Sequence, residues 1–144
     1  MSGYSGTPLA TKLGIREGHR VAFLGERHRV AFPKAPDGFG ALLGELPDGV
    51  TVKSRATGPL DVIVFFTKSR AELERRLPAL RRAMDPAGGL WIAWPKRSSG
   101  VETDMTEDVA RDLGLACRLV DNKVCAIDET WSGLRLVIRV KDRC

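Results

Sequence analysis

The pattern of apolar and polar residues is clearest in the middle of the chain, where two runs of five apolar residues occur at positions 62–66 (VIVFF) and 90–94 (LWIAW). Runs without polar alternation are typical of parallel strands that are covered on both faces. Between the runs, Ser69 and Glu72 have the spacing of a helix-capping box. Apolar residues then recur at helical spacing, at Leu73, Leu77, Leu80 and Met84. The pattern therefore predicts a right-handed strand–helix–strand unit, with a turn at residues 85–89 between helix and second strand.

The N-terminal part of the chain predicts a short helix, a longer helix and a strand. A threonine–proline pair followed by a later glycine predicts a helical segment over residues 7–14. Asp37 has a side chain suited to cap a helix over residues 37–46. The Pro-Asp-Gly turn that follows predicts the end of this helix and the start of a short strand at residues 50–52.

The five residues HRVAF occur twice, at positions 19–23 and 28–32. Two interpretations are open: a short hairpin that turns between the two copies, or one sheet strand over residues 20–24 followed by a duplicated insert that loops out. We favour the single strand. A repeat of this length is too short to predict a solenoid.

The C-terminal part of the chain predicts one more helix and two antiparallel strands. Asp104 and Glu107 are placed to start the helix, and Gly114 is placed to end it. The strands are predicted at residues 117–127 and 134–140. Apolar residues alternate with arginines in the second of them, which is typical of an edge strand with one covered face. Such an edge is a natural contact for a homodimer.

The order of these elements predicts an α/β fold, a three-layer Rossmann-like sheet that is mostly parallel and ends in a C-terminal antiparallel hairpin. With this antiparallel finish the plan resembles the methyltransferase variant of the sheet, shortened by about one strand–helix repeat. A chain of 144 residues has the length of one domain, so we expect a single domain over residues 1–144.

Composition narrows the class of protein further. With 43% hydrophobic and 28% charged residues the chain is ordinary for a globular protein, and no apolar run approaches the roughly 18 residues that cross a bilayer. The N-terminus lacks the basic and apolar regions of a secretory signal. Three cysteines without close spacing predict free thiols in a reducing cytoplasm and no metal site. The net charge of +5 permits anionic partners, including nucleic acid, without requiring them.

Two cofactor sites can be argued against from the residues. A methyltransferase of this plan would end its first strand in an acidic residue and a glycine-rich loop, and its second strand in a carboxylate that holds a ribose. Here the two strands end in FLGERH at positions 23–28 and KSR at positions 53–55. The segment GFGALLG at positions 38–44 misses the dinucleotide fingerprint by one position, although a basic residue after the next strand would suit NADP. We therefore predict no cofactor, with S-adenosylmethionine (SAM) and NADP both disfavoured.

Basic residues follow four of the predicted strands, at the end where open α/β sheets bind ligands. Ser69 would also lie at a helix N-terminus, whose free N–H groups favour an anion. The candidate anion site consists of Arg27, Lys53, Lys68, Ser69, Arg70, Lys96, Arg97 and Ser98. The alternative is that these residues form ordinary solvated loops of an arginine-rich chain. Trp131, in the predicted hairpin, is the tryptophan expected to be exposed, where it could stack on a base or on a partner's side chain.

Five stretches of the chain are the most distinctive: TPLATKLGI, APDGFGALLGELPDGV, SRAELERRLPAL, LWIAWPKRSSGVETDMTEDVAR and KVCAIDETWSGLRLVIR. Together they resemble a bacterial family of uncharacterised proteins known as domain of unknown function 3052. The resemblance covers nearly the whole chain and implies a single-domain bacterial cytoplasmic protein with an insertion at residues 26–34, but no activity.

The leading functional hypothesis is a non-catalytic binding or regulatory module that holds an anionic small molecule or a protein partner at the basic strand ends. A divergent SAM-dependent methyltransferase and a nucleic-acid accessory protein are the alternatives, so whether the chain is an enzyme stays open at this point.

Overall fold

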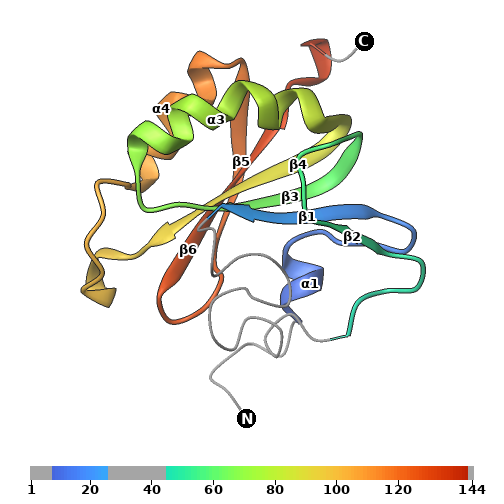
Figure 1. The fold of residues 1–144 in the computed structure, drawn as a ribbon, viewed down its shortest axis with the longest axis horizontal. Coiled ribbons are helices and arrows are strands. Elements are labelled where there is room, and N and C mark those ends of the chain that lie inside the picture. The colour runs from blue at the N-terminus through green and yellow to red at the C-terminus, as the bar shows by residue number, and fades with distance from the viewer. Residues whose placement is uncertain (1–7, 26–44, 143–144) are drawn as a thin grey trace.

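A computed structural model describes residues 8–25 and 45–142, and their strands form one six-stranded sheet (Figure 1). The strands are β1 (Arg20–Gly25), β2 (Thr51–Lys53), β3 (Leu60–Phe66), β4 (Met84–Pro95), β5 (Leu119–Ala126) and β6 (Trp131–Ile138). They lie in the order β2-β1-β3-β4-β6-β5. β2, β1, β3 and β4 pair in parallel, and β6 is antiparallel to both β4 and β5. The predicted α/β fold with a mostly parallel sheet and an antiparallel finish is confirmed.

Helices lie on both faces of the sheet, which gives three layers (Figure 1). The helices are α1 (Leu9–Lys12), α3 (Arg70–Ala83) and α4 (Glu107–Ala116), with short 3-10 turns η1 (Arg97–Ser99) and η2 (Val140–Asp142). α3 and α4 cover one face, and α1 lies against the other. In the part of the chain that the structure describes, no helix has the length and apolar character to cross a membrane.

The central strands are apolar on both faces because each face has its own core. Phe65 and Ile92 are partners in neighbouring strands and belong to the core beneath α3 and α4. Phe66 and Trp91 point the other way, into the core beneath α1. Side chains alternate between the two faces of a strand, so an unbroken apolar run fills two cores at once.

The crossover helix α3 follows its sequence signals closely. The Ser69 hydroxyl accepts a hydrogen bond from the Glu72 amide at 3.1 Å, as the capping box predicts. Leu73, Leu77 and Leu80 are buried along one side of the helix. The turn expected at residues 85–89 is instead a bulge inside β4: Met84 already pairs with Leu60, and the register then shifts before Gly89 pairs with Val62.

Two short N-terminal elements are also present. The helical segment expected at residues 7–14 is the shorter α1, and Pro8 precedes it without a side-chain cap. The first HRVAF copy forms β1, an interior strand, as the favoured interpretation expected. The second copy and most of the helix expected at residues 37–46 lie outside the described residues; Glu45 and Leu46 are described and are not helical.

The last strand is not the edge of the sheet, so this prediction is wrong. β6 lies between β4 and β5, and β5 is the edge strand. The alternation in β6 arises because Leu134 and Leu136 face the core beneath α4, while Arg135 lies on the other face. A homodimer through an open edge of β6 is therefore excluded by its two neighbours.

The second crossover helix, α4, differs from its prediction at both ends. Its N-cap is Thr106, whose hydroxyl accepts a hydrogen bond from the Val109 amide at 3.1 Å, and Asp104 makes a different contact described below. The helix also continues through Gly114, which is buried. Gly114 therefore permits close packing on β6, where an added Cβ would lie 2.9 Å from the terminal carbons of Leu136.

We expect Gly114→Ala to lower the free energy of unfolding, although alanine is the better helix former by about 1 kcal/mol. Overpacking against Leu136 costs about 1–3 kcal/mol and should exceed this gain. Urea unfolding of the variant measures the balance. In a Leu136→Ala background the space is open, so there the same substitution should stabilise the protein; stabilisation in the unmodified background would contradict the contact.

Candidate functional site

The carboxyl ends of the parallel strands meet at one edge of the sheet. Gly25, Phe66 and Ala93 lie side by side in neighbouring strands, and the Thr67 amide donates to the Ala93 carbonyl at 2.9 Å. Lysines stand at the ends of three of these strands: Lys53 closes β2, Lys68 follows β3 and Lys96 follows β4. Open α/β sheets bind ligands at this edge.

The N-terminus of α3 is already bonded within the protein. The Ser69 amide donates to the Thr67 hydroxyl at 3.0 Å, and the Arg70 amide donates to the carboxylate of Asp104 at 2.8 Å. Thr67 is fully buried, and its hydroxyl donates to the Glu72 carboxylate at 2.6 Å. An external anion would have to displace Asp104 here, so Ser69 and Arg70 serve the helix start in this structure.

The loop at residues 101–104 lies against Lys68. The Thr103 hydroxyl donates to the Lys68 carbonyl at 2.7 Å, which holds the loop in place. A hollow of about 560 Å³ lies here; its lining consists of Lys68, Ser69, Val101, Glu102, Thr103 and Asp104. Glu102 and Asp104 bring two negative charges to this hollow beside the positive charge of Lys68. The positive charge of the carboxyl edge therefore comes from the lysines at the strand ends.

The remaining predicted site residues are distributed as follows. Lys96 is half-buried, whereas Arg97 and Ser98 are exposed in η1. Lys53 is half-buried at the end of β2. Arg27 lies outside the described residues.

The expectation that Trp131 is exposed is wrong. Its side chain is 4% exposed, and its ring packs edge-on against Phe66 at a centroid distance of 5.2 Å. Trp131 is the first residue of β6 and pairs with Pro95, so it closes the core beneath α1 and is not part of a free hairpin tip. It therefore presents no open face on which a base could stack.

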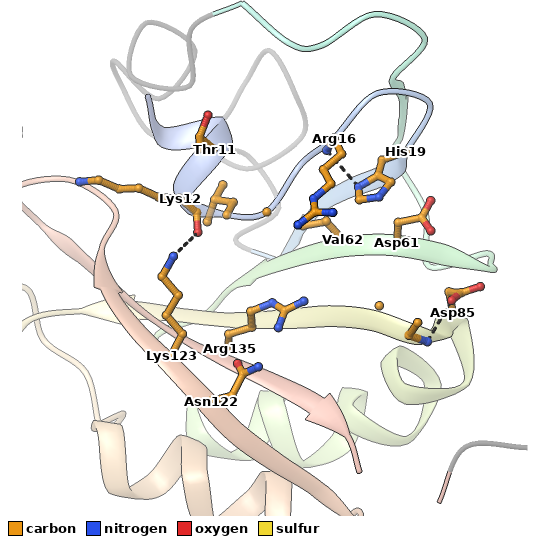
Figure 2. A pocket seen from close by; sticks show the side chains of 14 residues that line it. Thr11, Lys12, Arg16, His19, Asp61, Val62, Asp85, Asn122, Lys123 and Arg135 are labelled. Atoms are coloured by element: carbon orange, nitrogen blue, oxygen red, sulfur yellow. Dashed lines mark hydrogen bonds between the residues drawn. The ribbon is translucent and has the colours of Figure 1, made fainter. Parts of the chain in front are cut away.

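A second hollow lies at the opposite end of the parallel strands, and sequence reasoning missed it (Figure 2). Its volume is about 540 Å³, and it lies between the segment that contains α1 and the strands β3 to β6. Four cationic residues line it, Lys12, Arg16, Lys123 and Arg135, and the side chain of Lys12 points away from the hollow (Figure 2). The sequence held one signal, the charged Arg135 among the apolar residues of β6, but the spacing of the lining residues along the chain gives no motif.

The described cysteines, Cys117 and Cys125, are half-buried. Burial raises the pKa of the Cys125 thiol, which lies near Lys123. Within residues 8–25 and 45–142, no group of three or more histidine, cysteine or acidic side chains is placed to hold a metal ion.

No protein-family model matches the chain, and no curated protein matches it in sequence. The resemblance to domain of unknown function 3052 accordingly stays a prediction.

Solved structures match the chain in fold. A SAM-dependent methyltransferase from Aquifex aeolicus gives a TM-score of 0.61 at 15% identity, covering 91% of this chain and 88% of that chain. A TehB-like SAM-dependent methyltransferase from Corynebacterium glutamicum gives 0.56 at 10% identity, covering 96% and 91%. Magnesium protoporphyrin IX methyltransferase from Synechocystis with bound SAH gives 0.55 at 11% identity, covering 90% and 78%. These matches establish a methyltransferase-like fold for this chain.

Proposed function

We propose that this chain is a non-catalytic binding module with a methyltransferase-like fold, and that it holds an anionic small molecule at the carboxyl edge of its sheet. One observation carries the proposal: Lys53, Lys68 and Lys96 stand at the ends of three parallel strands, at the edge where this class of sheet takes its ligands. Arg97, exposed in η1, adds a fourth positive charge beside Lys96. Lysine side chains bind phosphate and carboxylate groups as point charges.

The charge of this edge suits an anion better than SAM. SAM carries a sulfonium and an ammonium against one carboxylate, so its net charge is positive and like charges at the rim would repel it. At the end of β2, where a carboxylate would hold ribose hydroxyls, the chain has Lys53. Gly25, at the end of β1, packs against the backbone of Phe66. The described residues therefore do not fit SAM well.

A divergent SAM-dependent methyltransferase is the second candidate. The observation in its favour is the fold itself, which several SAM-dependent methyltransferases share over most of their length. Because the identities are 10–15%, the shared fold does not carry their chemistry to this chain.

The two candidates can be separated by ligand binding to the full chain. We expect AMP and inorganic phosphate to raise the melting temperature at low salt, and SAM and SAH to leave it unchanged. A ligand present at a hundred times its dissociation constant stabilises by about 2.7 kcal/mol, which a thermal shift detects. Stabilisation by SAM or SAH alone would favour the methyltransferase.

Charge reversal then tests the site. Lys68→Glu and Lys96→Glu should each weaken AMP binding about tenfold or more, because each charged hydrogen bond contributes about 1.5–3 kcal/mol. Lys141→Glu is the matched control, since Lys141 is an exposed lysine in η2 that lies outside the proposed site. Equal affinities for the two site variants and the control would leave the basic edge as ordinary solvated loops.

A further inference from the structure

The hollow at the amino ends of the parallel strands is a second concave site, separate from the carboxyl edge. Its floor consists of β3 to β6, and its roof is the segment from α1 to the start of β1 (Figure 2). A volume of about 540 Å³ is within the range of small-molecule sites. The fold does not predict a site here, because its usual ligands lie at the other end of the strands.

Two positive charges lie opposite each other on the floor. Lys123 of β5 and Arg135 of β6 are direct partners in an antiparallel pair, so their side chains lie on the same face of the sheet. Like charges in this position destabilise a sheet. Together the two side chains place positive charge on this face of the floor.

Arg135 is placed by the backbone beneath it. A Cβ added at Gly89 would lie 2.7 Å from Cζ of Arg135, so the guanidinium lies directly over the glycine. No other residue type at position 89 leaves this space. The guanidinium is thereby directed along β4 into the hollow, as Figure 2 shows.

The carboxylates in the lining are engaged elsewhere. Asp61 accepts a hydrogen bond from the Arg20 amide at 2.8 Å and lies 3.5 Å from Nε of the same residue. Asp85 accepts from the Ala87 amide at 2.9 Å, within the β4 bulge. Among the described lining residues, the side chains of Arg16, Lys123 and Arg135 bring three positive charges against these two carboxylates.

The roof is fixed in place without a ligand. The indole N–H of Trp91 donates to the Leu13 carbonyl at 3.0 Å, and Nζ of Lys123 donates to the Lys12 carbonyl at 3.0 Å. These bonds hold the α1 segment, and with it Arg16, over the strands (Figure 2). A preformed site of this kind loses little entropy on binding.

We propose that this hollow binds a phosphorylated small molecule, with its phosphate between Arg16 and Arg135. Guanidinium groups bond phosphate oxygens in a fixed, bidentate geometry, and a phosphate monoester carries nearly two negative charges at neutral pH. The hollow is larger than a phosphate group, and the exposed side chain of Ala87 offers apolar surface to the organic part of the ligand. The proposal goes beyond the carboxyl-edge function and does not depend on it.

Titration of the full ¹⁵N-labelled chain with ribose 5-phosphate, followed by amide NMR, tests the site. We expect the amides of Gly14, Gly88 and Gly89 to shift, and to shift equally in Lys68→Glu, which alters only the carboxyl edge. Arg16→Gln and Arg135→Gln should each weaken this binding about tenfold, as the loss of a charged hydrogen bond predicts, with Lys141→Gln as the unaffected control. If shifts appear only at the carboxyl edge, or if Lys68→Glu abolishes them at Gly89, the hollow is not a binding site.

Gly89→Ala provides a test that removes no charge. The new Cβ meets the end of a flexible side chain, so Arg135 moves aside while the fold is kept. Binding of ribose 5-phosphate should fall about tenfold, with the thermal midpoint nearly unchanged. Wild-type affinity in this variant would overturn the role of Arg135, and equally tight binding of succinate would overturn the assignment to phosphate.

Discussion

Gly25→Ala is expected to lower the free energy of unfolding by about 2–6 kcal/mol, because the substitution combines two costs. Gly25 has φ +101°, a conformation that L residues rarely adopt and that costs about 1–3 kcal/mol. The added Cβ would also overlap the backbone carbonyl of Phe66, which cannot move aside as a side chain can. Such overpacking costs a further 1–3 kcal/mol or so. Urea unfolding measures the sum.

Gly100→Ala is the matched control for the first of these costs. Gly100 also has positive φ, +76°, but an added Cβ there would meet no atom within 4 Å. We expect this variant to lose only about 1–2 kcal/mol, the cost of a left-handed conformation. Equal losses at the two positions would show that β1 and β3 are not in close contact at Gly25.

Trp91→Ala is expected to lower the free energy of unfolding by about 3–5 kcal/mol and to weaken ribose 5-phosphate binding in the hollow beneath α1. Trp91 is fully buried, and removal of a large core side chain leaves a cavity. It also bonds the Leu13 carbonyl, so the segment that holds Arg16 loses an anchor. Chemical unfolding gives the first quantity, and calorimetric titration gives the second.

Trp91→Phe separates the anchor from the packing. Phenylalanine retains most of the ring but leaves the Leu13 carbonyl without its donor, at a cost of about 1–3 kcal/mol. Trp94→Phe is the control, because Trp94 is buried in the core on the other face of the same strand. Weakened binding in Trp91→Phe and unchanged binding in Trp94→Phe are expected. Unchanged binding in Trp91→Phe would mean that the bond between Trp91 and the Leu13 carbonyl is not needed for binding in the hollow.

The central unit of the fold could be predicted from sequence because its signals are local. The apolar runs of β3 and β4 and the capping box of α3 each lie within a few residues of the structure they specify. The failures are contacts between distant segments. Gly114 looked like a helix end, but it packs beneath Leu136, and Trp131 looked exposed, but it meets Phe66.

The candidate sites show the same division. Strand ends can be located from sequence, so the lysines of the carboxyl edge were found. The bond between Asp104 and the Arg70 amide joins residues 34 positions apart, and no pattern in the sequence indicates it. Likewise, the fit of Arg135 over Gly89 depends on the register between β4 and β6, and the roof depends on how α1 crosses the sheet.

β4 links the two proposed sites, since it passes Gly89 at one end of the sheet and is followed by Lys96 at the other. At roughly 3.3 Å per residue, the strand separates these residues by about 23 Å. Salt screens charges beyond roughly 8 Å at physiological ionic strength, so the electrostatic interaction between ligands bound at the two ends would be weak. Saturating one site with its ligand should therefore leave the dissociation constant of the other site unaltered. Each site would then respond only to the concentration of its own ligand.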